Sequence, residues 1–228
     1  MTPPGRQDWS DPASARRWDA CHLEGNPTRA AHLELLLELL AQAGAQRVLD
    51  LGCGSGLVAE MVLERLPAAE VWGLDASDPM LELAQRRLSR FGPRAHLVRA
   101  DVTRLDGVEV PTCEAAIAVQ SLHHVGRRQA LAYAWLRDRL QAGSLLVLVE
   151  RVAVPAASLY DAFHLVKQRE GHARNPGSWE EYQADLEAAG DRPLSLSELT
   201  GMLEQAGFQS GCLDVRADRA LLVARLGA

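Results

Sequence analysis

The sequence predicts an α/β fold: a doubly wound, mostly parallel sheet of about seven strands, with a C-terminal antiparallel strand pair and an inserted helical lid. Two observations lead to this prediction. Short apolar runs alternate with amphipathic stretches of helical periodicity, which is typical of βαβ units in a parallel sheet. One such run, residues 47–51, is followed by the pattern Gly-x-Gly-x-Gly, as expected for a buried strand that ends in a tight turn before a helix.

Composition and charge are those of an ordinary soluble globular protein. The 228 residues, 47% hydrophobic and 24% charged, can bury one sizeable core, and no apolar run is long enough to span a bilayer. The net charge of −6 disfavours general affinity for nucleic acid. The N-terminus lacks an export pattern and the four cysteines are scattered, so we expect a reduced, cytoplasmic protein without disulfides and predict no metal site.

The first 28 residues are rich in Pro, Gly, Asp and Arg, and they are predicted to form a loosely ordered arm with one short helix over residues 11–21. Trp18 on that helix could close over a ligand, or it could simply anchor the arm. Residues 29–228 are predicted to form a single domain. Its first helix, residues 29–43, carries leucines on one face, and His32 on this helix is predicted to be a surface or cap residue.

Strands and helices then alternate as far as residue 152. The predicted strands are residues 47–51, 71–75, 95–100, 112–119 and 144–149, and the predicted helices are residues 57–66, 77–91 and 127–141. Because the carboxyl ends of parallel strands meet at one edge of a sheet, polar side chains that end these strands should converge there. These residues are Asp50, Asp75, Asp101, Gln120 and Glu150.

Residues 155–194 interrupt the alternation and are predicted to form a helical lid over this edge. Two helices, residues 158–170 and 178–189, are indicated by Ser-x-x-acid capping patterns at their starts and glycines at their ends. A further capping box at Ser195 begins a helix that ends at Gly207. The antiparallel strand pair is predicted over residues 211–215 and 220–226.

The glycine turn indicates a nucleotide-type ligand, because glycine leaves the backbone open and the next helix presents free N–H groups. Leu57 stands where the dinucleotide fingerprint Gly-x-Gly-x-x-Gly requires its third glycine, which disfavours a pyrophosphate cofactor. Asp50, just before the turn, would repel a pyrophosphate and pair with an ammonium group. We therefore expect a cationic or zwitterionic group near the turn.

Two further acids describe the rest of the ligand. Asp75 could accept hydrogen bonds from both hydroxyls of a ribose, and Asp101 could accept one from the exocyclic amine of adenine. Val102 or Met80 could lie against the adenine ring. Each acid could instead cap a helix. Taken together, the acids describe adenosine with an amino-acid tail.

Four segments, in the same order, resemble the motifs of the class I S-adenosylmethionine (SAM)-dependent methyltransferases, a family with a Rossmann-like fold. The segments are residues 48–56, 73–81, 100–102 and 116–125. The resemblance extends over about residues 45–152 and a late helix, and it implies SAM as the cofactor. The cofactor-binding residues predicted from the motifs are Asp50, Gly52, Cys53, Gly54, Asp75, Ala76, Met80, Asp101, Val102 and Gln120.

The reaction implied by the resemblance is an in-line SN2 transfer of the sulfonium methyl group to an O, N, C or S atom. Positioning in a dry site can supply much of the rate, so no base is obligatory. His123 and His124 could deprotonate a hydroxyl or merely position groups, and His164 with Asp161 one turn away could form an oriented base. Candidate acceptor contacts are Trp18, Glu150, Tyr160 and Trp179, although aromatic residues of a lid more often pack on one another.

The motifs leave the acceptor open. A small molecule is favoured, and a tRNA or protein acceptor is the alternative that the low positive charge disfavours. An NAD-dependent oxidoreductase and a non-catalytic adenosine-binding module are more distant alternatives. The missing third glycine argues against the first, and the intact set of three acids argues against the second. The sequence leaves the oligomeric state open.

Overall fold

A seven-stranded sheet with the order β3-β2-β1-β4-β5-β7-β6 runs through the computed structural model, which describes residues 8–21 and 26–227. Strands β1 to β5 pair in parallel, whereas β7 lies antiparallel between β5 and β6. This confirms the predicted fold class. The strands are β1 Arg47–Leu51, β2 Glu70–Asp75, β3 Ala95–Arg99, β4 Cys113–Val119, β5 Leu140–Arg151, β6 Phe208–Arg216 and β7 Arg219–Leu226.

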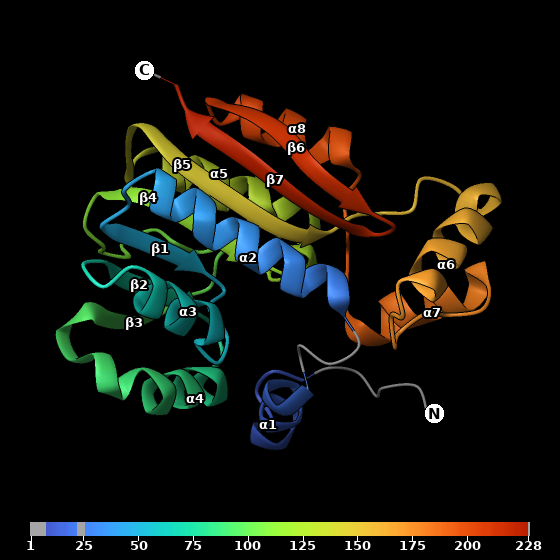
Figure 1. The fold of residues 1–228 in the computed structure, drawn as a ribbon, viewed down its shortest axis with the longest axis horizontal. Helices are drawn as coiled ribbons and strands as arrows, with labels where there is room; N and C mark the ends of the chain where they lie inside the picture. Colours follow the sequence, from blue (N-terminus) through green and yellow to red (C-terminus); the bar gives the residue numbers. More distant parts are fainter. Residues whose placement is uncertain (1–7, 22–25, 228) are drawn as a thin grey trace.

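Helices cover both faces of the sheet (Figure 1). They are α1 Pro12–Cys21, α2 Pro27–Gln42, α3 Leu57–Arg65, α4 Asp78–Leu88, α5 Gln129–Arg137, α6 Tyr160–Arg169, α7 Trp179–Ala189 and α8 Leu196–Gln205. Because successive side chains of a strand point to opposite faces, Val48 packs in one core layer with the leucines of α2, and Leu49 packs in the other with Leu136 of α5. The central strands are therefore buried on both sides, as their continuous apolar runs predict.

Two sequence predictions about this scaffold are wrong. The helix predicted to reach residue 141 ends at Arg137, and β5 already begins at Leu140, because Leu140 pairs with Cys113 ahead of an irregularity in the β4–β5 ladder. His32 is not a surface residue. It is 2% exposed and its Nε2 lies 2.8 Å from Oδ2 of Asp214 on β6, a partner that lies far away in the sequence.

Three helices lie near the carboxyl edge of the parallel strands: α6 and α7 beyond β5, and α1 beside the start of α2 (Figure 1). Helices α6 and α7 pack on each other through a small cluster that contains Tyr160, Tyr182 and Trp179. Residues 1–7 and 22–25 of the predicted arm lie outside the described residues. Within the described residues, no helix combines the length and the apolar character needed to cross a membrane.

Candidate active site

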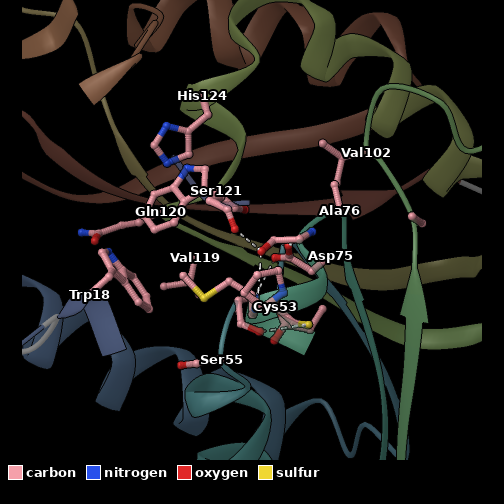
Figure 2. Close-up of a pocket in the computed structure, with 18 of the residues that line it drawn as sticks. Trp18, Cys53, Ser55, Asp75, Ala76, Val102, Val119, Gln120, Ser121 and His124 are labelled. Carbon is pink, nitrogen blue, oxygen red and sulfur yellow. Dashed lines mark hydrogen bonds between the residues drawn. The ribbon is translucent and has the colours of Figure 1, made fainter. Parts of the chain in front are cut away.

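A cavity of about 580 Å³ opens at the carboxyl ends of the central strands, beside α1. Its volume is in the range of small-molecule and cofactor sites. All ten residues predicted to bind the cofactor line this one cavity, although they come from four separate segments of the chain. Figure 2 labels Cys53, Asp75, Ala76, Val102 and Gln120 among them. Residues that are up to 70 positions apart in the sequence therefore meet at the sheet edge, as the doubly wound topology requires.

In the glycine turn, the backbone at Gly52 lies close to Ser121 and to Leu74. Gly52 has a φ of +70°, and a Cβ placed on it would lie 2.4 Å from the Cβ of Ser121. The N–H groups of Gly52 and Cys53 both donate to the carbonyl oxygen of Leu74, at 2.7 and 3.0 Å. These bonds hold the turn against β2. Only glycine satisfies both the left-handed backbone and the lack of space at position 52.

Asp50 is a buried carboxyl group that lines the cavity with an unused oxygen. Its Oδ2 has no hydrogen-bond partner among the described residues, and the residue is 1% exposed. Burial, and then the negative charge of Asp75, raise the pKa of Asp50 to about 7. A buried carboxylate without a partner is costly, so an ammonium group placed here would be bound strongly.

Asp75 and Asp101 are both held in place by hydrogen bonds from the backbone. Oδ2 of Asp75 accepts from the N–H of Gly54 at 2.8 Å, and Oδ1 accepts from the N–H of Ser77 at 2.9 Å. Oδ1 of Asp101 accepts from the N–H and the hydroxyl of Thr103, which leaves Oδ2 available. Burial raises the pKa of Asp75, whereas for Asp101 the hydrogen bonds from Thr103 outweigh burial and lower the pKa.

Arg29 in the first turn of α2 is a site residue that the sequence analysis missed. It lines the cavity, is 3% exposed and donates from Nη1 to Oε1 of Gln120 at 2.7 Å. Its Nε has no partner among the described residues, and its Cζ lies 5.4 Å from the ring centre of Trp18. Gln120 itself has a φ of +51°, a strained backbone at a site. The sequence gives no sign that Arg29 belongs to the site, because it lies outside the motifs and fits the pattern of an ordinary helix residue.

The N-terminal helix α1 crosses one side of the cavity. Trp18 and Trp9 both line the cavity, and their ring centres are 5.9 Å apart. The Ser55 hydroxyl donates to Asp19 on α1 at 2.5 Å, and Arg87 on α4 donates to the same carboxylate at 2.9 Å. These bonds tie the helix to the loop that carries the glycine turn.

His124 lines the cavity (Figure 2), whereas His123 and Glu150, also predicted as site residues, are not among its lining residues. Glu150 is 1% exposed, and its Oε1 accepts from the N–H groups of Ser121 and Leu122. Nδ1 of His123 lies 2.6 Å from Oε2 of Glu150. Glu150 therefore fixes the backbone of the loop after β4 by hydrogen bonds, without lining the cavity itself. Burial, and then the charge of His124, lower the pKa of His123, whereas the carboxylates of Glu150 and Asp191 act in the opposite direction.

Asp191, which follows α7, joins the two histidines. Its Oδ1 lies 3.1 Å from Nδ1 of His124 and 3.6 Å from Nε2 of His123, and its Oδ2 accepts from Nη1 of Arg151 at 2.5 Å. In the part of the chain that the structure describes, these two histidines and Asp191 are the group whose ligating atoms lie close enough together to hold a metal ion. The sequence analysis missed this group because Asp191 lies far from the histidines along the chain.

The remaining candidates, on α6 and α7, lie outside the cavity. The hydroxyl of Tyr160 donates to the carbonyl oxygen of Pro176 at 2.7 Å, and Nδ1 of His164 lies 2.7 Å from the same oxygen. Asp161 is exposed and forms no ion pair with His164 among the described residues. Trp179 packs 6.0 Å from the ring of Tyr160. The structure thus places these side chains between the two helices and not in the cavity, and their roles as an oriented base and as acceptor contacts stay predictions.

Comparison with known proteins identifies relatives of this chain among methyltransferases. A family model described as a methyltransferase domain matches residues 48–143. The chain is 33% identical over 174 residues to the ubiquinone/menaquinone biosynthesis C-methyltransferase UbiE of Syntrophotalea carbinolica, which covers 75% of this chain and 71% of that enzyme. It is 38% identical over 124 residues to trans-aconitate 2-methyltransferase of Paracidovorax citrulli, which covers 54% of this chain and 43% of the relative.

Solved structures share the fold at lower identity. Human N-acetylserotonin methyltransferase in complex with SAM matches with a TM-score of 0.68 and 14% identity, over 96% of this chain and 58% of that one. The DhpI–SAH complex matches with a TM-score of 0.65 and 20% identity, over 95% of this chain and 93% of that one. These relationships favour methyl transfer over an oxidoreductase or a non-catalytic adenosine-binding module. The chain therefore belongs to the class I SAM-dependent methyltransferase family, and its cofactor is SAM.

Proposed function

We propose that this enzyme transfers the methyl group of SAM to a small-molecule acceptor bound in the cavity beside α1. The observation that carries the proposal is that one cavity of about 580 Å³ is lined both by the ten predicted cofactor residues and by a separate group of aromatic side chains. The names of the relatives support a small molecule, since they refer to ubiquinone/menaquinone biosynthesis and to trans-aconitate.

In this proposal the polar groups of the cavity match the parts of SAM one by one. Asp50 receives the ammonium group of the methionine tail, and Arg29 receives its carboxylate through the unused Nε. Asp75 accepts from the ribose hydroxyls, while Asp101 accepts from the adenine amine with Oδ2. When bound, SAM supplies an electrophilic methyl group on a positively charged sulfur. The pairing of a free carboxyl oxygen with a free guanidinium donor fits a zwitterionic tail.

The acceptor end of the cavity is formed by Trp9, Trp18 and His124. These rings are neighbours: the ring centres of Trp9 and His124 lie 5.7 Å apart, and those of Trp9 and Trp18 lie 5.9 Å apart. Two indoles and one imidazole favour an acceptor with an apolar, flat body and one polar atom. The chain contributes by excluding water and holding the acceptor in line with the methyl group, which can supply much of the rate.

Binding and labelling experiments test this proposal. Calorimetry of the full chain should show binding of SAM and of S-adenosylhomocysteine, and no binding of NAD. A cell extract incubated with the enzyme and methyl-labelled SAM is then separated into metabolite, RNA and protein fractions. Label that accumulates in the metabolite fraction supports the proposal. Label confined to tRNA or to protein would replace it with the alternative acceptor class, and no binding of SAM would overturn it.

A cytoplasmic location is part of the same proposal. It is supported by the free thiols of Cys53, Cys113 and Cys212 in the described part of the chain. Fractionation of cells that express the native protein tests it, because recovery in an exported or periplasmic fraction would contradict it.

A further inference from the structure

We propose that His123, His124 and Asp191 form a site for a divalent transition-metal ion at the acceptor end of the cavity, where the ion binds an oxygen atom of the acceptor. The metal site stands on the geometry of these three side chains. Only the second part, the metal-bound acceptor oxygen, rests on the proposed function. The sequence predicted no metal site, because the three ligands are not at any recognisable spacing.

The ligating atoms are separated by distances that one metal ion can bridge. Oδ1 of Asp191 lies 3.1 Å from Nδ1 of His124 and 3.6 Å from Nε2 of His123, and one ligating atom of each residue lies within 4.8 Å of those of the other two. Tetrahedral ligands at about 2.1 Å from a zinc ion are roughly 3.4 Å apart. The atoms therefore need to move little to coordinate an ion.

The hydrogen bond behind His123 directs a lone pair into the site. Its Nδ1 lies 2.6 Å from Oε2 of Glu150, whose other oxygen accepts from two backbone N–H groups. Because an ionised carboxylate only accepts, Nδ1 of His123 is the donor, and in the neutral ring Nε2 carries a lone pair. A carboxylate behind a ligating histidine is a common arrangement at metal sites, where it orients the ring and fixes its tautomer.

The lone pair of His123 faces a second electron-rich atom. Oδ1 of Asp191 has no hydrogen-bond partner among the described residues, although the side chain is only 5% exposed. Nδ1 of His124 lies 3.1 Å from this oxygen, and its interaction with the carboxylate lowers the pKa of Asp191. This oxygen and Nε2 of His123 are 3.6 Å apart, a separation that a bound cation between them could bridge. The position of the two atoms is therefore suited to a positively charged ligand.

The charges around the site allow such an ion. Arg151 pairs with Oδ2 of Asp191, which weakens binding of a cation, and Asp218, 3.1 Å from Nε of Arg151, offsets part of that positive charge while it also contacts Lys167. Two imidazoles and one carboxylate suit Zn²⁺, Fe²⁺, Co²⁺ or Mn²⁺ better than Mg²⁺ or Ca²⁺, which prefer oxygen ligands alone. The site is therefore proposed for a first-row transition metal.

The position of the site relative to the cavities suits a catalytic role. His124 lines the cavity of about 580 Å³, and Asp191 lines a second cavity of about 430 Å³. Three protein ligands leave a coordination position open, as in catalytic and not in structural metal sites. An acceptor hydroxyl bound there would lose its proton to solvent. Its oxygen then forms the bond to the methyl carbon while the electron pair of the breaking C–S bond stays on sulfur.

Cobalt titration tests the metal site without any assay of methyl transfer. The untagged full chain is treated with a chelator, dialysed and titrated with Co²⁺, and visible absorption is recorded. We expect saturable binding of one ion with the absorption bands of a nitrogen- and oxygen-ligated cobalt centre. His124→Ala, at a half-buried position, should weaken binding at least tenfold, whereas His164→Ala, on α6 and outside the cluster, should bind as the native protein does.

Calorimetry with SAM on the same samples separates the two proposals. If the metal-free protein and the His124→Ala variant still bind SAM, the fold and the cofactor site are intact, and the cobalt result decides on the metal site alone. Absence of saturable Co²⁺ binding, or equal affinity in His124→Ala, overturns the metal site and points to a proton shared by the histidines and Asp191. Loss of SAM binding by the native protein would instead count against the proposed function.

Discussion

At the scale of single residues, two buried charges determine what the cavity can hold. Asp50 and Arg29 line the same cavity, and each keeps one polar atom without a partner among the described residues. Each group is an electrostatic partner of the other, and the atoms without a partner could bind a ligand that carries the opposite charges. Under the proposed function, the protonation state of Asp50 should therefore affect cofactor binding.

Asp50 should make SAM binding depend on pH. Because burial and Asp75 raise its pKa to about 7, the carboxyl group becomes protonated below this pH and no longer pairs with an ammonium group. We expect the Kd of SAM to rise about tenfold for each pH unit below 7. Calorimetry over a pH series measures this, and Asp50→Asn should bind weakly at every pH, without the slope.

The raised pKa of Asp50 affects the stability of the cofactor-free protein in the opposite direction: stability falls as pH rises, whereas SAM binding strengthens. The folded state holds the proton of Asp50 more tightly than the unfolded state does, so this carboxyl group lowers stability as pH rises from about 4 to about 7. Asp50→Asn should therefore raise the Tm of the cofactor-free protein at about pH 8 and change it less at about pH 5. A Tm difference that is the same at both pH values would contradict this assignment.

Gly52 should tolerate no side chain. Gly52→Ala combines a φ of +70° with a Cβ that would lie 2.4 Å from the Cβ of Ser121, so we expect a loss of about 2 kcal/mol or more in stability and at least a tenfold loss of SAM affinity. Gly201→Ala is the matched control. Gly201 lies in α8 with a negative φ and nothing within 4 Å of its added Cβ, and the change should stabilise the protein by about 0.5–1 kcal/mol. Urea denaturation compares the two variants.

At the scale of elements, α1 acts on the cavity through a few side chains. Asp19 joins it to Ser55 and to Arg87, and the Ser77 hydroxyl donates to the carbonyl oxygen of Trp9 at 2.5 Å. The core layers of the sheet do not include this helix. Docking of α1 is therefore separable from folding of the sheet.

Asp19→Ala should loosen α1 without unfolding the protein. Loss of the bonds to Ser55 and Arg87 removes the charged contact that holds Trp18 over the cavity, so we expect SAM to dissociate about tenfold faster, a cost of about 1.4 kcal/mol. Stopped-flow fluorescence measures this rate. Arg16→Ala, an exposed change on the same helix, serves as the control and should leave the rate unchanged. If both variants release SAM at the native rate, α1 does not cover the bound cofactor.

At the scale of the whole molecule, buried ion pairs join α6 and the segment after α7 to the sheet. Arg151 at the end of β5 is 2% exposed and contacts Asp191 after α7 and Asp218 in the β6–β7 turn. Lys167 on α6 reaches the same Asp218 at 3.4 Å. Removing Arg151 leaves Asp218 with Lys167 as a counter-charge but takes the guanidinium away from Asp191, and a buried carboxylate that loses its partner costs more than the pair itself contributes.

Arg151→Met should destabilise the protein by about 3–5 kcal/mol, because Asp218 and Asp191 lose their common partner. Arg127→Ala removes an exposed ion pair with Glu198 and should cost at most about 1 kcal/mol. Urea denaturation of both variants measures the difference. The proposed importance of the buried pairs is wrong if the two substitutions cost the same.

Much of the fold follows from local patterns. Apolar runs, capping boxes and glycines predict the order of strands and helices and the C-terminal strand pair, because these signals depend on neighbours within a few residues. The boundary predicted between α5 and β5 is wrong because Leu140 pairs with Cys113 in the sheet, and Cys113 belongs to a strand that is distant in the sequence. His32 is misassigned for the same reason, since its partner Asp214 belongs to β6.

The sequence by itself determined which cofactor the protein uses, because Asp50, the glycine turn, the acid that ends β2 and the acid that follows β3 stand in an order that the topology brings to one edge. Only the tertiary structure decided which other groups meet them. Arg29 enters the cavity from α2, Glu150 turns away behind the histidines, and Asp191 approaches them from beyond α7. These contacts depend on how distant elements pack and on which charges they bury. The spacing of residues within a short segment of the chain does not determine them.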